Sequence, residues 1–238
     1  MDERVARIRE EEKKYHEACY DDYKLFEEGS WLHKPVLTVM KNLDLLDQPG
    51  PLSVLDLGCG VGRNSIPLAK VLQEHHIQGQ VVCVDLLESA LSKLMSYGEQ
   101  FGVHHLLKPV ASDIGNFTIS EKEYDYIVAV SSLEHVNTEA MLRHTLHHMT
   151  AGTKDNGINC IIINTNIRET DIRSGESLEV LIEVNMETQA MEHLLSKAYT
   201  SWEVIDHHVK QLEFAIVRNE RDILLSSDCI TFVVRKIG

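Results

Sequence analysis

The sequence has no long apolar segment and no excess of basic residues. None of its apolar runs approaches the roughly 20 residues of a membrane-spanning helix, and residues 1–4 are too charged to begin a signal peptide. Its 238 residues contain 23 Lys and Arg against 37 Asp and Glu, a net charge of −14. Proteins that bind a phosphate backbone usually have a basic face. We therefore expect neither a nucleic-acid partner nor a membrane partner.

Cysteines are few and have no disulfide-framework spacing. The five are odd in number; Cys83, Cys160 and Cys229 fall in predicted core strands, and Cys59 falls in a loop. This pattern indicates reduced, buried thiols and predicts a cytoplasmic protein. Repeats and low-complexity tracts are also absent. With 43% apolar and 25% charged residues, positions 1–238 suit a single globular domain.

Glycine makes up only 13 residues, but three of them stand close together. Residues 54–62 read as a buried strand that contains an acid and runs into a turn; the residues of interest are Asp56, Gly58, Cys59, Gly60 and Gly62. Glycine accepts positive φ and lets the backbone approach a ligand closely. At the carboxyl end of a strand in a doubly wound sheet, such a turn predicts a binding loop for a small molecule.

The spacing of the glycines distinguishes two classes of cofactor. A dinucleotide fingerprint requires a glycine three residues after Gly60, where this chain has Arg63. The carboxylate of Asp56 would repel a pyrophosphate, but it suits S-adenosylmethionine, which carries an ammonium and a sulfonium and no phosphate. The motif favours S-adenosylmethionine. A dinucleotide and a purely structural turn remain as alternatives.

Acids also follow the next two predicted strands. Asp85 ends the second strand, where a carboxylate can accept two hydrogen bonds from a ribose diol, and Leu86 can pack on the base. Asp113 follows the third strand and can accept from the adenine amine, while Ile114 covers the ring. One acid at a strand end is more often a turn or a helix cap. Three after successive strands favour a cofactor site.

Together with residues 124–130, these motifs resemble the class I S-adenosylmethionine-dependent methyltransferases over about residues 30–237. The resemblance implies their Rossmann-like fold, their methyl-transfer activity and S-adenosylmethionine as the cofactor. Residues 62–65 and 230–236 are similar to the tellurite-resistance-type (TehB-like) members. A His-Arg pair of those enzymes, before the last strand, has no clear counterpart here, which argues against an oxyanion substrate.

The predicted elements alternate along the chain. We predict strands at 52–57, 80–85, 105–110, 124–130, 158–164, 202–217 and 228–236, and helices at 2–27, 35–47, 63–77, 88–101, 138–149 and 187–199. Alternation implies right-handed crossovers and a parallel sheet, so we expect a doubly wound α/β fold with a mostly parallel seven-stranded sheet. The last two strands form an antiparallel edge hairpin. Residues 1–47 form an N-terminal helical lid, whose first helix is capped near Gly29, and 52–237 form the core.

The carboxyl end of the fourth strand holds the candidates for chemistry. Methyl transfer is an in-line displacement that depends mainly on positioning, and a base is needed only if the acceptor carries a proton. Glu134 or His135 can be that base, since histidine titrates in the useful range; alternatively, both only orient the loop and cap the next helix. Ser131 here and Asn64 after the glycine loop are assigned to the cofactor site.

Two other segments offer ligand contacts. Tyr20 is a catalytic candidate and Trp31 a cofactor contact, because both can close over the cofactor; equally, they can simply dock the N-terminal segment. The connection predicted at 165–186 is long enough to be functional. Its Arg168 and Arg173 can hold an anionic substrate or be ordinary solvated charges.

No metal site is predicted. His144 and His148 share a helix face, but an H-E-x-x-H arrangement and a carboxylate at matched spacing are both missing. The pair Glu134 and His135 is similar to one in ubiquinone-pathway O-methyltransferases, some of which hold a metal with an acidic cluster there. This chain lacks the preceding glutamate of that cluster and has Ser131 and Ser132 instead.

The sequence therefore predicts a methyltransferase for a small-molecule acceptor, acting as a monomer or homodimer. The alternative is a protein that binds S-adenosylmethionine without turnover, as a sensor or a partner subunit. A nucleic-acid methyltransferase is disfavoured, because residues 131–134 read Ser-Ser-Leu-Glu where amino-methylating enzymes have N-P-P-[YF].

Overall fold

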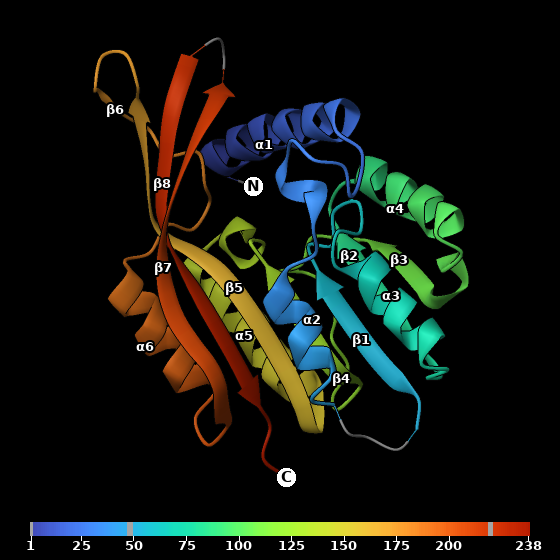
Figure 1. Cartoon of the computed structure of the whole chain (residues 1–238). Coiled ribbons are helices and arrows are strands. Elements are labelled where there is room, and N and C mark those ends of the chain that lie inside the picture. Colours follow the sequence, from blue (N-terminus) through green and yellow to red (C-terminus); the bar gives the residue numbers. More distant parts are fainter. Residues whose placement is uncertain (1, 47–49, 219–220) are drawn as a thin grey trace.

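One mixed β-sheet organises the chain (Figure 1). The computed structural model describes residues 2–46, 50–218 and 221–238. The strands are β1 (Leu52–Leu57), β2 (Gly79–Asp85), β3 (Leu107–Ala111), β4 (Tyr124–Val130), β5 (Thr153–Asp171), β6 (Ser177–Leu178), β7 (Glu203–Arg218) and β8 (Arg221–Arg235). Their order is β3-β2-β1-β4-β5-β8-β7, with the two-residue β6 paired to β5. The first five strands in this order are parallel to one another, and β8 runs antiparallel to both of its neighbours, β5 and β7. The predicted doubly wound sheet and its C-terminal hairpin are confirmed.

Helices cover both faces of the sheet. They are α1 (Glu3–Asp22), α2 (Leu37–Leu43), α3 (Ser65–Glu74), α4 (Glu88–Gln100), α5 (Glu139–Gly152) and α6 (Thr188–Ala198). Short 3₁₀ turns lie at Trp31–His33, His104–Leu106 and Leu133–His135. Helices α2, α3 and α4 pack on one face, and α5 and α6 pack on the other (Figure 1). No helix in the described part of the chain is long and apolar enough to cross a bilayer.

The central strands supply two separate cores. Neighbouring side chains of a strand point to opposite faces, so Val54 of β1 packs with α2, α3 and α4, whereas Leu55 and Leu57 pack with α5 and α6. In β4, Tyr126 and Ile127 divide in the same way. Being buried on both faces, these strands are mostly apolar, which is why they could be predicted.

The helices at the N-terminus are shorter than predicted. Helix α1 ends at Asp22 rather than at residue 27, because Tyr23 is extended and its N–H bonds to Cys19 O. Gly29 has a positive φ of 117°, but it lies in the following turn and caps no helix. Helix α2 is Leu37–Leu43, and its predicted end at Asp47 lies outside the described residues.

The connection predicted at 165–186 begins later than expected, because residues 165–171 continue strand β5; from residue 172 to α6 the chain is a connection that contains only the short β6. Strand β5 continues to Asp171, pairing with β8 over most of its length with one register shift between Thr165 and Arg168. The outer half of β5 (residues 165–171) and β6 form a projection together with the adjoining parts of β7 (residues 210–218) and β8 (residues 221–229). We call this projection the arm (Figure 1). The loop was predicted because residues 165–171 are mostly polar.

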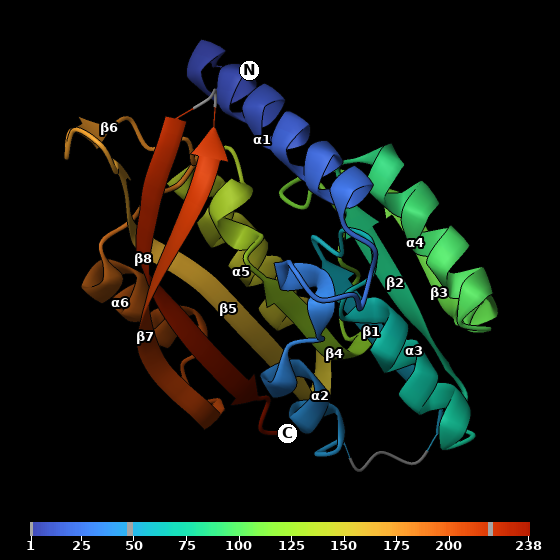
Figure 2. The same ribbon diagram turned by 45° about the horizontal axis from the view of Figure 1, so that its top comes forward.

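Helix α1 bridges the arm and α4 (Figure 2). Near its beginning, the Arg4 guanidinium donates to Ile182 O at 2.9 Å, and near its end the Lys93 ammonium of α4 donates to Tyr20 O at 2.8 Å. The helix therefore lies on the side of the sheet where β1, β2 and β4 end at their carboxyl termini.

Candidate functional site

The glycine loop follows β1 in a conformation that favours glycine. Gly58, Gly60 and Gly62 have φ angles of 76°, 52° and 95°, in the left-handed region. The loop is tied to β2: Gly58 and Cys59 donate their N–H groups to Val84 O at 2.8 and 3.0 Å. The backbone thus forms a fixed turn at the carboxyl end of the sheet, where doubly wound folds bind ligands.

Asp56 lies beneath this turn. Only 2% of its surface is exposed, and its carboxylate accepts from the Ser65 hydroxyl at 2.6 Å, linking β1 to the start of α3. Burial, with a smaller contribution from the charge of Asp85, raises the pKa of Asp56 to about 6, although the hydrogen bond from Ser65 lowers it. In the structure this acid supports the loop from below; its predicted contact with the cofactor stays a prediction.

Asp85 stands beside the loop at the end of β2. Its two carboxylate oxygens accept from Gly60 N at 2.8 Å and Leu87 N at 2.9 Å. Each carboxylate oxygen can accept more than one hydrogen bond, so the side chain can hold the loop and a diol together. The neighbouring Leu86 is 48% exposed, free to cover a flat ring.

Asp113 is held by a residue of α1. Arg9 donates to Asp113 Oδ2 at 2.7 Å and to Glu183 Oε1 at 3.3 Å, with 14% of the arginine side chain exposed. The other oxygen of Asp113 accepts from Gly115 N at 2.9 Å, and Ile114 is buried beside it. The acid assigned to the adenine amine is thus also the point where α1 is attached to the core.

His135 joins the same cluster. Its Nδ1 lies 3.1 Å from Glu183 Oε2 and 3.8 Å from Glu12 Oε2 of α1. Burial lowers the pKa of His135, but Glu12, Glu183 and Glu134 outweigh it and raise the pKa to about 9. The imidazole is therefore a cation at neutral pH. A cation cannot act as a general base, which weighs against that role for His135.

Glu134 is buried and only half satisfied. Its Oε1 accepts from Asn164 N and Nδ2 at 3.2 and 2.8 Å, whereas its buried Oε2 has no hydrogen-bond partner among the described residues. Burial raises the pKa of this carboxyl. Ser131, at the end of β4 with φ of 49°, accepts from the same Asn164 amide at 3.2 Å.

Aromatic residues of the N-terminal segment cover the glycine loop. A Cβ atom at Gly60 would lie 2.9 Å from the Tyr20 hydroxyl oxygen, which places Tyr20 directly over the turn. Trp31 contacts the Tyr20 ring edge-on at 6.2 Å, and the Arg63 guanidinium lies 5.6 Å from the Trp31 ring centre. Asn64 accepts from Val36 N at 3.0 Å, so this residue holds the segment before α2.

The structure thus brings most of the predicted residues to one edge of the sheet. Arg9, Glu183 and Asn164 belong to the same cluster, and sequence reasoning missed them. The only local signal was the placement of three arginines at positions 4, 7 and 9 of a helix that is otherwise rich in acids. Arg173 pairs with Asp222 on the arm, which agrees with an ordinary surface charge.

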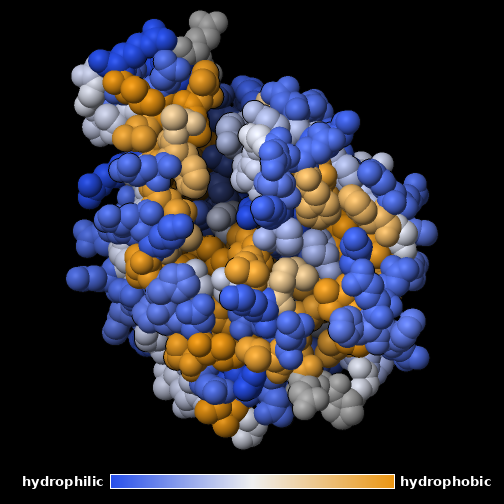
Figure 3. Space-filling view, viewed as in Figure 1, coloured by the Kyte–Doolittle hydropathy of each residue, from blue (hydrophilic) through white to orange (hydrophobic). Residues whose placement is uncertain are grey.

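A hollow lies between α1 and the arm (Figure 3), on the side where β4 and β5 leave the core. Apolar side chains of the arm border this hollow.

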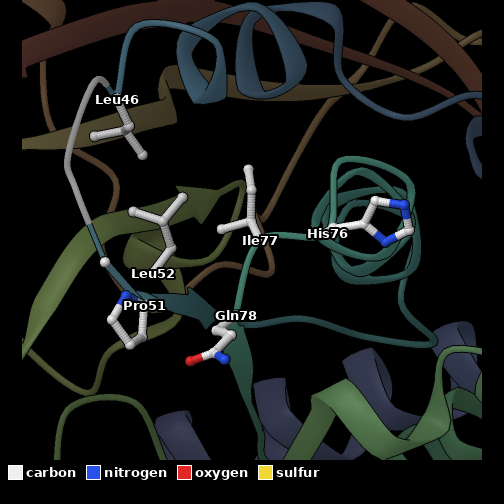
Figure 4. Close-up of a pocket in the computed structure, with 7 residues that line it drawn as sticks. Leu46, Pro51, Leu52, His76, Ile77 and Gln78 are labelled. Carbon is white, nitrogen blue, oxygen red and sulfur yellow. The ribbon is translucent and has the colours of Figure 1, made fainter.

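A separate cavity of about 440 Å³ lies at the amino ends of β1 and β2. Leu52 and Gln78 line that cavity (Figure 4). It therefore lies at the edge of the sheet opposite the glycine loop. No cluster of three His, Cys, Asp or Glu residues within the described ranges is arranged to hold a metal ion.

Comparison with known proteins agrees with this geometry. Residues 54–157 match the family model described as a methyltransferase domain. The fold is similar to TehB from Haemophilus influenzae, with a TM-score of 0.60, 21% identity, and coverage of 84% of this chain and 61% of that chain. This chain thus spans less than two thirds of the length of TehB. A search of curated proteins finds no match.

Two further solved structures have the same fold. A putative methyltransferase from Bacillus halodurans has a TM-score of 0.60 at 14% identity, covering 84% of this chain and 99% of that one. An S-adenosylmethionine-dependent methyltransferase from Clostridium acetobutylicum has a TM-score of 0.56 at 16% identity, covering 84% and 89%. The predicted resemblance to class I methyltransferases, TehB included, and the predicted cofactor agree with these matches.

Proposed function

We propose that this chain methylates a small molecule bound between α1 and the arm, because residues 54–157 match the methyltransferase-domain model and the fold is similar to that of S-adenosylmethionine-dependent methyltransferases. One observation carries the proposal. The glycine loop, Asp85 and Asp113 meet at the carboxyl edge of the sheet, directly beneath α1.

The residues at this edge fit S-adenosylmethionine. The cofactor presents hydrogen-bond donors, namely its ammonium, its ribose hydroxyls and its adenine amine, and the site presents carboxylate acceptors. Asp85 would receive the ribose diol and Asp113 the adenine amine, while Leu86 and Ile114 would cover the ring. When bound, the cofactor supplies a methyl group activated by a sulfonium.

The role of the protein is chiefly to position the reactants and to exclude water. Tyr20 and Trp31 would close over the methionine part of the cofactor, since Tyr20 already covers Gly60. Ser131 and Glu134 would face the acceptor from the end of β4. His135, cationic at neutral pH, would hold α1 in place through Glu12 and Glu183 rather than move a proton.

The enclosure by α1 supports a small acceptor. This helix spans from the arm to α4 (Figure 2) and is held at both ends, so a folded macromolecule would have to displace it. The net charge of −14 further disfavours a nucleic acid.

Calorimetry with S-adenosylhomocysteine tests the proposal. Replacing Asp85 by Ala should weaken binding at least about tenfold, because charge-assisted hydrogen bonds to the ribose are lost. Asp85→Asn retains an oxygen for the Gly60 N–H, so its affinity for S-adenosylhomocysteine should lie between those of the wild type and Asp85→Ala. An unchanged dissociation constant in Asp85→Ala would remove the ribose assignment. If the protein bound no S-adenosylhomocysteine and instead retained a pyrophosphate-bearing cofactor, the proposed function would be wrong.

A further inference from the structure

We infer that the acceptor is an amphipathic amine, with an apolar body on the inner face of the arm and a nitrogen at Glu134 Oε2. This inference rests on the proposed function and names the class of acceptor for the same site. Three observations carry it: the apolar face of the arm, the charges around the hollow, and the unpaired oxygen of Glu134.

On β7 and β8, one face of the arm is more apolar than the other. Opposed residues of an antiparallel ladder lie on the same face, as do residues two apart along a strand. The face that includes Asn164 carries these residues in successive pairs: Cys229 and Lys210, Ser227 and Leu212, Leu225 and Phe214, and Ile223 and Ile216. On β5 this face also carries the acids Glu169 and Asp171, so its apolar part belongs to β7 and β8. On the other face β8 carries Asp228, Ser226, Leu224 and Asp222. The apolar face continues the side of the sheet on which α2 packs, and apolar side chains border the hollow in Figure 3.

This apolar face is only partly covered. Phe214 is 52% exposed, although it lies in the middle of a strand and next to Leu225. Exposed aromatic surface beside a hollow is typical of ligand-binding sites. Tyr15 of α1 is 38% exposed, and α1 runs from the arm to α4 (Figure 2), so this helix can cover a bound molecule from the opposite side.

Unlike four other acids near α1, the end of β4 and the arm, Glu134 has no cation at ion-pair distance in the described residues. Asp113 and Glu183 pair with Arg9, Glu12 and Glu183 lie beside His135, and Glu169 pairs with Arg218 at 2.7 Å. Burial raises the pKa of Glu134 and the charge of His135 lowers it, but His135 lies at ion-pair distance from Glu12 and Glu183. A cationic ligand would give Glu134 a direct partner.

Glu134 is placed to receive that cation. Its Oε1 is fixed by Asn164, which also contacts Ser131 and the Ser227 hydroxyl, so the carboxylate is held at the junction of β4, β5 and β8. Cys229, on the apolar face of the arm, is close enough for the Glu134 charge to raise its pKa after the effect of burial. Through Asn164 and Ser227, the Glu134 carboxylate thus lies near the foot of the apolar face. A buried carboxylate oxygen without a partner is costly, and an N–H donor from a ligand removes this cost.

The same placement serves the reaction. The ammonium of the bound amine gives one proton to Glu134, which leaves a lone pair on nitrogen. That lone pair forms the new bond to the methyl carbon, and the carbon–sulfur bond breaks with its electron pair remaining on sulfur. The products are the methylated ammonium and the neutral thioether. The proton is then released from Glu134 to solvent, so no oxidant or other reactant is required.

Three probes of similar shape test the charge requirement: 2-phenylethylamine, 2-phenylethanol and 3-phenylpropionate. With the protein saturated by S-adenosylhomocysteine, calorimetry should show the amine binding at least about tenfold tighter than the alcohol, and the carboxylate binding weakest. In Glu134→Gln the amine should lose this advantage, whereas the alcohol and S-adenosylhomocysteine should bind as before. Gln keeps the size of the side chain and can still accept from Asn164.

The arm offers a matched pair of variants. Phe214→Ala should weaken the amine and the alcohol alike, by about fivefold, because apolar contact area is lost. Val217→Ala, on the polar face of the same strand and 67% exposed, should change neither. Equal effects of the two variants, or a carboxylate probe that binds best, would overturn the inference. So would an amine that fails to bind at about 1 mM or is unaffected in Glu134→Gln. Loss of S-adenosylhomocysteine binding in the wild type would instead refute the proposed function.

Discussion

Gly60 and Tyr20 are closer together than most side chains at position 60 would permit. A Cβ atom added to Gly60 would approach the tyrosine hydroxyl to 2.9 Å, and the φ of 52° already disfavours a residue with a side chain. Tyr20 is buried, with 6% of its surface exposed. Position 60 therefore favours glycine for two reasons, namely its own backbone conformation and the helix that lies over it.

Gly60→Ala should destabilise the protein by about 1–2 kcal/mol, the usual cost of a left-handed conformation for a residue with a Cβ. Part of this effect should come from the tyrosine hydroxyl. In a double-mutant cycle measured by urea unfolding, the variant that combines Tyr20→Phe with Gly60→Ala should therefore lose less free energy of unfolding than the two single variants lose together. Strict additivity would mean that the hydroxyl and residue 60 do not interact.

The glycine loop could be predicted from the sequence because its signal is local. Gly58, Gly60, Gly62 and the preceding Asp56 lie within seven residues, and the turn requires these residue types whatever surrounds it. The Arg9–Asp113 pair could not be predicted in this way. Its partners are 104 positions apart and belong to a helix and a loop whose relative placement depends on the whole fold.

At the scale of elements, α1 is attached to the core through its arginines. Arg4, Arg7 and Arg9 contact Ile182 O, Glu179 and Glu183, respectively, so one end of the helix docks on residues 179–183. The contacts differ in burial. The Arg7 and Glu179 side chains are 57% and 54% exposed, whereas those of Arg9 and Glu183 are 14% and 2% exposed. The buried contact should dominate, because solvent screens the exposed one.

Hydrogen exchange distinguishes these two arginines. Arg9→Gln should raise exchange of the α1 amides at least about tenfold, since it leaves Asp113 buried without its cation and removes one of the two cations beside Glu183. Arg7→Gln should change exchange less than about twofold. If both variants exchanged like the wild type, α1 would be held mainly by its apolar side chains, such as Val5 and Ile8, and not by its charges.

The arm illustrates why some elements escape prediction. Residues 165–171 of β5 are mostly polar, because one face of this part of the strand lies towards solvent, and the sequence reads as a loop. Their strand conformation depends on pairing with residues 223–228 of β8, which come more than 50 positions later. A strand at the edge of the core, unlike β1 or β4, has no continuous apolar run to mark it.

At the scale of the whole molecule, stability should depend on pH through His135. Its pKa is raised from 6.5 in a model compound to about 9, although burial alone would lower it, because Glu12 and the other two acids favour the cation. The folded protein thus binds this proton more tightly than the unfolded chain does. The stabilisation is complete below about pH 6.5 and is lost as the pH rises through about 9.

A comparison of the wild type with His135→Gln at several pH values isolates this effect. The difference in free energy of unfolding should be at most about 3 kcal/mol at pH 6 and should fall towards zero by about pH 10. His208→Gln is the control, since His208 pairs with Asp206 on an exposed part of β7. A difference for His135→Gln that stays constant with pH would contradict a charged histidine in this cluster.

The docking of α1 also constrains the order in which the chain can fold. Arg4 meets a carbonyl 178 positions further along the chain, so the beginning of α1 has no docking surface until residues 179–183 have been added. The rest of the helix meets α4 and Asp113, which come earlier in the chain. The helix can therefore attach in two stages, and the cofactor edge of the sheet is complete only after the second.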